Sequence, residues 1–300
     1  MQMLFQLNIP TPLKKYQFKT FSFLLKHDDL IHKDFSGNKA RKIYYYLNNL
    51  PQNITTIVSF GSVLSNAMYS LSVFAKAKGL HFRYYAHHIP KKLIENPSGN
   101  LLYALENGME LIEGYNKIII KENELFINEG IANKEAYFGI ELLAKELIKQ
   151  LKAQEYTVFL PSGTGTTALF LSKAFKMLQA NNFEVVTTPC VGNSTYLKEQ
   201  FFELESNEIF HPKIIDTKKR YHFGRLYQEF YQIWLELQKE TKIEFDLLYD
   251  PKGWLALMEN KLYEKNLVYI HQGGGLGNDT MKKRYKVFLQ KRSSNDNNFK

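Results

Sequence analysis

The sequence predicts an α/β fold in which mainly parallel sheets are flanked by helices. First, short β-rich runs alternate with longer helical stretches along the chain. Second, no self-similar period recurs, which argues against solenoids and propellers. Third, glycine-containing loops follow three of the apolar runs, as they do where a parallel sheet binds a ligand. The β-rich runs are residues 55–60, 156–160, 183–187 and 267–270.

Three helices are predicted from apolar residues that recur at spacings of three and four. They run from Ala67 to Lys78, from Ala136 to Ala153 and from Ala168 to Ala180. No linker rich in proline and glycine marks a domain boundary. If the chain forms two domains, we expect them to be interwoven, with the chain crossing between them more than once.

The composition is that of a water-exposed globular chain, with 300 residues, 44% hydrophobic and 23% charged. No stretch approaches the ~20 consecutive apolar residues of a membrane span. Residues 1–8 carry no basic segment ahead of an apolar one, so we expect no secretory signal and a cytoplasmic location. Cys190 is the only cysteine, which excludes an intrachain disulfide and a thiolate metal cluster. We expect no metal site.

The net charge of +9 invites a nucleic-acid interpretation, but residues 280–300 alone carry a net charge of +6. We interpret this segment as a frayed, solvated terminus rather than a nucleic-acid arm. We therefore expect neither a nucleic-acid nor a membrane partner.

A phosphate cradle is predicted between the second β-rich run and the helix that follows it. The segment Pro161–Thr167 combines backbone N–H groups at a helix start, two glycines and three threonine hydroxyls. It lacks the Gly-Lys-Ser/Thr of nucleoside-triphosphate loops and the spaced glycines of dinucleotide folds. The alternative is an ordinary helix entry, which its position after an apolar strand disfavours. The residues concerned are Gly163, Thr164, Gly165, Thr166 and Thr167.

Lys39 and Lys42 lie three residues apart on one side of a predicted helix, with Arg41 off that side. Neighbouring cations disfavour each other's charge, which lowers a lysine pKa toward amine nucleophilicity. Taken alone, the segment is better interpreted as a basic helix start.

The segments 26–30 (Lys-His-Asp-Asp-Leu) and 36–42 (Ser-Gly-Asn-Lys-Ala-Arg-Lys) resemble motifs of the 1-aminocyclopropane-1-carboxylate deaminase and D-cysteine desulfhydrase family. The family's motifs are Lys-Arg-Asp-Asp-Leu and Gly-Gly-Asn-Lys-x-Arg-Lys. The resemblance runs in order from about Pro10 to Gly277. Further matching blocks are Gly61–Asn66, Gly99–Leu102 with Gly108–Glu110, Glu129–Asn133 and His271–Gly274.

This resemblance implies a pyridoxal phosphate (PLP) enzyme of fold type II, similar to the tryptophan synthase β subunit. Two α/β domains would then enclose the cofactor in a cleft. The larger would comprise residues 1–42 and 151–300, and the smaller residues 43–150. Family members are commonly dimers, so a homodimer is implied.

The resemblance also implies residue roles. Lys39 would bind the cofactor aldehyde and then, as a freed amine, move protons. Lys42 and the loop Gly163–Thr167 would hold the phosphate. Asn66 would bond the 3′-oxygen of the pyridine ring, and Ser65 the substrate carboxylate. The segment His271–Gly274 would line the cofactor face, with His271 itself more plausibly a structural histidine.

Tyr249 corresponds to the active-site tyrosine of the family, close to the substrate carbons. The next residue is Glu in the deaminases, where it reaches the pyridine nitrogen, and Thr in the desulfhydrases; here it is Asp250. A carboxylate at this position would keep the pyridine nitrogen protonated, although Asp is one methylene shorter than Glu. The alternative is an exposed turn residue before Pro251.

Other departures from the family motifs cluster on the substrate side and leave the substrate open. They are Ser36, Ile131, Ala132, Pro251 and Gln272. The leading hypothesis is a PLP-dependent deaminase or lyase that releases ammonia and a keto acid from a small amino acid. D-Cysteine and the cyclopropane acid are equally favoured. The alternatives are a PLP-binding homologue without turnover and, on net charge alone, a nucleic-acid binder.

Overall fold

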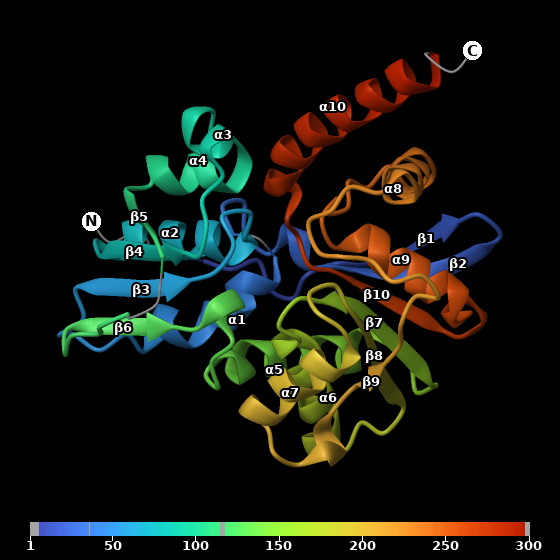
Figure 1. The fold of residues 1–300 in the computed structure, drawn as a ribbon. Coiled ribbons are helices and arrows are strands. Elements are labelled where there is room, and N and C mark those ends of the chain that lie inside the picture. Colours follow the sequence, from blue (N-terminus) through green and yellow to red (C-terminus); the bar gives the residue numbers. More distant parts are fainter. Residues whose placement is uncertain (1–5, 36, 115–117, 298–300) are drawn as a thin grey trace.

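The computed structural model describes residues 6–35, 37–114 and 118–297, whose strands form two sheets (Figure 1). Expectations that fall on residues 1–5, Ser36 and residues 298–300 lie outside this part. The larger sheet has the order β1-β2-β10-β7-β8-β9, and the smaller β5-β4-β3-β6. The strands are β1 (Leu13–Phe18), β2 (Phe21–His27), β3 (Thr56–Phe60), β4 (His81–Ala86), β5 (Met109–Glu113), β6 (Glu124–Ile127), β7 (Tyr156–Ser162), β8 (Phe183–Pro189), β9 (Lys213–Ile214) and β10 (Leu267–His271).

All strand pairs are parallel except the hairpin of β1 and β2. The four predicted β-rich runs are β3, β7, β8 and β10, so the predicted fold class is confirmed. Every residue of β7 and β10 is buried, which is typical of strands covered on both faces and explains their apolar runs. The hairpin was not predicted, because β1 is mostly polar and largely solvent-facing.

Helices cover both sheets, and the three predicted ones are α2, α5 and α6. The side chain of Ser65 caps α2 by accepting the N–H groups of Ala67 and Met68. The helices are α1 (Asn38–Asn48), α2 (Asn66–Lys78), α3 (Lys91–Glu95), α4 (Gly99–Glu106), α5 (Ala136–Gln150), α6 (Thr166–Met177), α7 (Ser194–Leu204), α8 (Gln228–Thr241), α9 (Asp250–Glu259) and α10 (Asn278–Asn297).

The chain builds β1, β2 and α1, then the smaller sheet, and then returns to the larger sheet. Helix α5 belongs to the predicted small domain, yet its Ile140 and Leu143 share a hydrophobic cluster with Val158 of β7 and Phe170 of α6. This packing favours grouping α5 with the larger sheet. The domain boundaries themselves stay a prediction.

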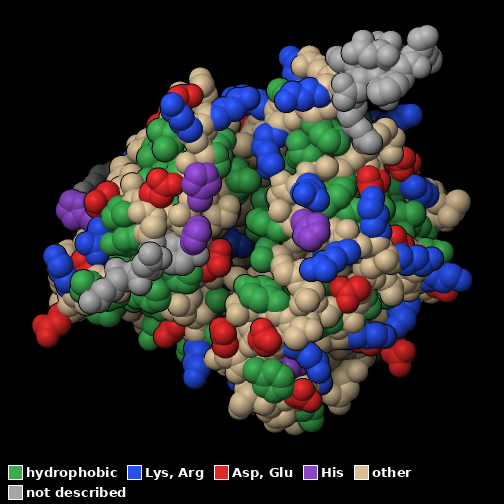
Figure 2. Space-filling model, viewed as in Figure 1, with side chains coloured by type: hydrophobic (Ala, Val, Ile, Leu, Met, Phe, Trp, Pro, Cys, Tyr) green, Lys and Arg blue, Asp and Glu red, His purple; other side chains and the backbone are tan. Residues whose placement is uncertain are grey.

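The interpretation of the C-terminal segment as a frayed terminus is wrong for residues 280–297, which belong to α10 (Figure 1). Met281 and Tyr285 are buried in the core of the larger sheet, and Phe288 packs against it. These three residues are four and three positions apart, so they lie on one face of the helix, which packs against the core. The dense positive charge around them hid this pattern in the sequence. No helix among the described residues combines the length and the apolar character that crossing a membrane requires. Figure 2 shows a hollow between the two halves of the molecule.

Candidate active site

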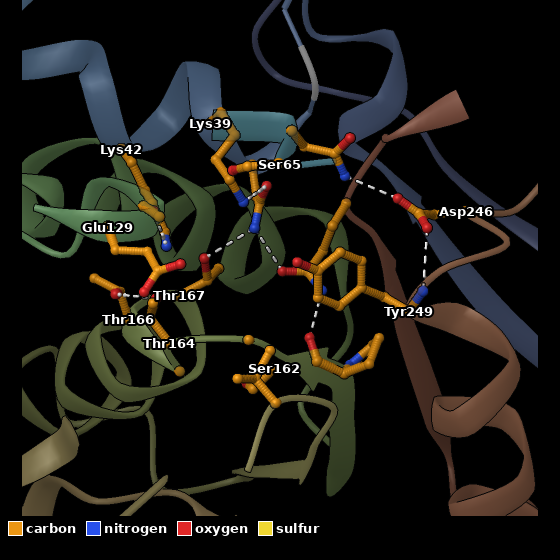
Figure 3. A pocket seen from close by; sticks show the side chains of 18 of the residues that line it. Lys39, Lys42, Ser65, Glu129, Ser162, Thr164, Thr166, Thr167, Asp246 and Tyr249 are labelled. Atoms are coloured by element: carbon orange, nitrogen blue, oxygen red, sulfur yellow. Dashed lines mark hydrogen bonds between the residues drawn. The ribbon is translucent and has the colours of Figure 1, made fainter. Parts of the chain in front are cut away.

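A pocket of about 180 Å³ lies where the carboxyl ends of β3, β7 and β10 meet the starts of α1 and α9 (Figure 3). This is the edge at which parallel α/β sheets bind ligands. Every predicted site residue lines the pocket, and their individual roles remain predictions. They are Lys39, Lys42, Ser65, Asn66, Gly163, Thr164, Gly165, Thr166, Thr167, Tyr249 and Asp250.

The two lysines of α1 reach the pocket in different surroundings. The Nζ of Lys39 donates to Asn38 Oδ1 at 3.1 Å. Lys42 is 3% exposed, and its Nζ donates to the carbonyl of Gly130 at 2.9 Å. No carboxylate of the described residues forms an ion pair with Lys42. A buried ammonium without a counter-ion is unfavourable, so this position favours an anionic ligand.

Burial is the main cause that lowers both lysine pKa values. It lowers the pKa of Lys39 to about 8, while the charge of Asp246 opposes the shift. It lowers the pKa of Lys42 well below the ordinary value, and the charge of Lys39 lowers it further. The sequence argument from neighbouring cations therefore applies to Lys42, whereas Lys39 owes its lowered pKa to desolvation.

The loop before α6 has the form of an anion cradle. Gly165 has a φ of 73°, and a Cβ atom there would lie 2.4 Å from the ring of Phe201. The hydroxyls of Thr164 and Thr166 are 2.9 Å apart. The first N–H groups of a helix have no acceptor within the helix. Together with Lys42, these donors fit the phosphate of PLP.

Two side chains at the start of α2 retain donors for a ligand. Asn66 Nδ2 donates to Asp246 Oδ2, and Asn66 Oδ1 accepts from Asn100 Nδ2, both at 2.8 Å. An amide has two N–H donors, so one remains after these contacts. The Ser65 Oγ accepts two backbone N–H groups and still has its O–H to donate.

Asp250 is the first residue of α9 and is 2% exposed, so its interpretation as an exposed turn residue is wrong. It accepts the Tyr269 hydroxyl at 2.6 Å and the backbone N–H of Asp246 at 2.8 Å. Burial, and then the charge of Asp246, raise the pKa of Asp250 well above its ordinary value. The neighbouring Tyr249 ring lies against Gly163, where a Cβ atom would come within 3.4 Å of Cε1.

Asp246 is a pocket residue that the sequence analysis did not select. Its Oδ1 accepts the N–H groups of Leu248 and Tyr249, and its Oδ2 accepts Asn66. Burial raises its pKa to about 6, and Lys39 is among the groups that oppose this shift. The only sequence signal was its place three residues before Tyr249, the residue that corresponds to the family's active-site tyrosine, because an isolated Asp before a helix is common.

Gln272, one of the departures from the family motifs, joins three elements of the pocket. Its Nε2 donates to the carbonyl of Pro161, and its Oε1 accepts from Asn38 Nδ2, both at 2.7 Å. The Gln272 backbone can lie this close to the start of α1 because residue 37 is a glycine. A Cβ atom on Gly37 would lie 2.1 Å from the Gln272 carbonyl oxygen. The glutamine amide therefore ties the loop after β10 to α1 and β7.

His271 is a structural histidine, as predicted. Its Nδ1 accepts the N–H of Gly273 at 3.1 Å, so Nε2 carries the proton and donates to the Glu244 carbonyl at 3.1 Å. Its ring stacks on Phe245 with centroids 5.0 Å apart. Burial lowers its pKa, which favours the neutral ring. Gln272 and Gly273 line the pocket in its place.

Comparison with solved structures identifies the fold as that of the type II PLP enzymes. An "ACC deaminase homologue" superposes with a TM-score of 0.77 at 20% identity, over 93% of this chain and 94% of that one. A hydrogen sulfide-producing enzyme from Fusobacterium nucleatum gives 0.66 at 13% identity, over 92% and 99%. A pyridoxal 5′-phosphate-dependent aspartate racemase gives 0.62 at 14% identity, over 88% and 90%.

Within that class, the predicted resemblance to the 1-aminocyclopropane-1-carboxylate deaminase and D-cysteine desulfhydrase family is confirmed. A Thermotoga maritima protein whose provisional name is 1-aminocyclopropane-1-carboxylate deaminase is 26% identical, over 89% of this chain and 95% of that protein. No protein-family model matches the chain. The prediction that the chain is an enzyme is likewise confirmed by these relatives.

Proposed function

We propose that this chain is a PLP-dependent deaminase or lyase that releases ammonia and a keto acid from a small amino acid. The observation that carries the proposal is that Lys39, with a pKa lowered to about 8, lies in one pocket with an anion cradle that includes Lys42, which forms no ion pair with a carboxylate of the described residues. When bound, PLP supplies an aldehyde and an electron sink for bonds broken at the substrate Cα. D-Cysteine with water would yield pyruvate, ammonia and hydrogen sulfide. The cyclopropane acid with water would yield a four-carbon keto acid and ammonia.

The residues of the pocket have separate proposed roles in binding the cofactor, binding the substrate and moving protons. The Lys39 amine, neutral in a substantial fraction near pH 8, would hold the cofactor and, once freed, carry protons to or from the substrate carbons, which for D-cysteine include Cα. Lys42 and the N–H groups of Gly163–Thr167 hold the phosphate. Ser65 donates to the substrate carboxylate, and Asn66 donates its remaining N–H to the ring oxygen. Asp250 is the proposed partner of the pyridine nitrogen, and Tyr249 covers the substrate carbons.

The visible spectrum of the purified protein, before and after borohydride, tests this proposal. Peptide mapping should place a pyridoxyl group on Lys39. Addition of D-cysteine or of the cyclopropane acid should change the spectrum and release a keto acid. An adduct on Lys39 without a keto acid from any amino acid would favour the non-catalytic alternative. A protein that cannot be loaded with PLP would contradict both the proposed function and the non-catalytic alternative.

The lowered pKa of Lys39 predicts a pH dependence of loading. The rate at which cofactor-free protein reacts with PLP should rise with pH with a midpoint at about 8 and level off above it, because only the neutral amine attacks the aldehyde. Asp246→Asn should shift this midpoint to lower pH, since the Asp246 charge raises the lysine pKa. Stopped-flow absorbance measures both. A midpoint near the ordinary lysine value of 10.5 would contradict the prediction.

Replacing Lys42 should weaken the recognition of phosphate specifically. Lys42→Met is expected to raise the Kd of PLP by about 10- to 100-fold, which corresponds to the loss of one charge-assisted hydrogen bond. The Kd of unphosphorylated pyridoxal should stay nearly unchanged. Fluorescence titration of cofactor-free protein gives both constants. Lys91→Met is the matched control, because the Lys91 side chain is 88% exposed. An equal rise in Kd for PLP and pyridoxal would contradict a role of Lys42 in binding the phosphate.

A further inference from the structure

Glu129 is an ionisable residue of the pocket that the proposed roles leave unused. It lies two residues after the end of β6 and lines both the pocket and an adjoining cavity of about 890 Å³. Among the described residues, Ser62 also lines both. Figure 3 shows its side chain pointing into the pocket on the side of Lys42 and Thr164. Glu129 therefore lies at the boundary between the pocket and the larger cavity, and a substrate side chain that extended toward that cavity would pass it.

The backbone of residues 61 and 62 lies close to the Glu129 carboxylate. A Cβ atom on Gly61 would lie 2.7 Å from Glu129 Oε1, and the Ser62 N–H is near enough to favour the charged carboxylate. No lysine or arginine of the described residues forms an ion pair with it. Burial raises its pKa, and the Ser62 N–H opposes the shift. After burial, the Glu129 charge is the main cause that raises the pKa of Tyr196, which lines the same pocket.

A carboxylate has about four acceptor sites, so Glu129 can accept a hydrogen bond from a ligand even with the Ser62 N–H nearby. The charge of the adjoining cavity decides which kind of donor fits. Its lining includes Lys92, Lys283, Arg284 and Lys291, and among the described residues that line it Glu129 alone is acidic. Figure 2 shows Lys, Arg and His side chains around the hollow. A cationic side chain would be repelled there, whereas a neutral donor would not.

We propose that Glu129 accepts a hydrogen bond from a hydroxyl or amide group on the substrate side chain. The inference rests on the proposed function and narrows its substrate class to amino acids such as serine or asparagine. With serine, the Cα–H and Cβ–O bonds break and water leaves. Water then hydrolyses the resulting enamine, so that serine yields pyruvate and ammonia.

Binding tests the inference independently of turnover. Spectral titration of PLP-loaded protein with both enantiomers of each amino acid should give a lower Kd for serine than for alanine, or for asparagine than for leucine. Glu129→Leu should reduce that preference by about 10- to 100-fold, the worth of a hydrogen bond to a charged group, and Glu129→Gln should retain part of it. Glu122→Leu, at an exposed position, is the matched control. If the wild-type protein shows neither preference, the inference is overturned.

Turnover adds a second comparison where pyruvate is formed. β-Chloroalanine with water yields pyruvate, ammonia and hydrogen chloride, and its leaving group has no donor. Glu129→Leu should raise KM for serine without a matching change for β-chloroalanine. An equal rise in KM for both compounds would indicate a structural role for Glu129 and would contradict the inference. Loaded protein that binds amino acids without releasing any keto acid would refute the proposed function, while the binding preference still decides the role of Glu129.

Discussion

Replacing Lys39 with alanine is expected to abolish the borohydride-fixed adduct and to lower turnover by about 10³-fold or more. The reason is that Lys39 combines a pKa near 8 with a position in the pocket beside Asp246. The other amine in the pocket, Lys42, donates to the Gly130 carbonyl in the proposed phosphate site. Mass spectrometry of reduced, digested protein and a keto-acid assay measure the two effects.

Lys39→Arg is the matched control for this prediction. It retains a cation at the same place on α1 but lacks an amine that reacts with the aldehyde. We expect it to bind PLP without forming the adduct, and to be as inactive as Lys39→Ala. A wild-type adduct that maps to Lys42 would show that the two lysine roles are exchanged.

Replacing Arg41 with leucine is expected to cost about 3–5 kcal/mol of unfolding free energy, because it leaves buried carboxylates without their partner. Arg41 is 1% exposed, and its guanidinium contacts Asp28 at 2.7 Å and Glu146 at 2.9 Å. Lys26 donates to the same Glu146 at 2.6 Å. These bonds join α1, which carries both pocket lysines, to β2 and α5.

Denaturant unfolding of cofactor-free protein measures this effect. Lys145→Met is the control: it breaks an ion pair with Glu141 four residues away on α5, where the lysine side chain is 45% exposed. That change should cost no more than about 0.5 kcal/mol. Similar costs for the two variants would mean that the Arg41 ion pairs contribute no more than a surface pair.

Much of the pocket was predictable because it is assembled from strand ends. β3, β7 and β10 are apolar runs that the sequence marks clearly, and parallel strands bring the loops after them to one edge of a sheet. The loop Gly163–Thr167 and the residues Ser65 and Asn66 meet for this reason. Lys39 and Lys42 were predictable from helical spacing, and the family resemblance supplied their roles.

Other features depend on contacts between residues far apart in the chain. Asp246 belongs to the pocket because it accepts a hydrogen bond from Asn66, 180 residues away, and lies near the charge of Lys39. Arg41 lies between Lys39 and Lys42 and could equally have been solvated; only the approach of Asp28 and Glu146 makes its burial tolerable.

The sequence by itself determined the fold class, the cradle and the identity of the pocket lysines, because these follow from hydrophobic periodicity, glycine placement and local spacing. Tertiary structure alone decided which charges are buried, why Lys39 has a lowered pKa, and that residues 278–297 form a helix anchored to the core. Desolvation and ion pairing depend on what surrounds a side chain in space, and that surrounding exists only once distant segments have packed together.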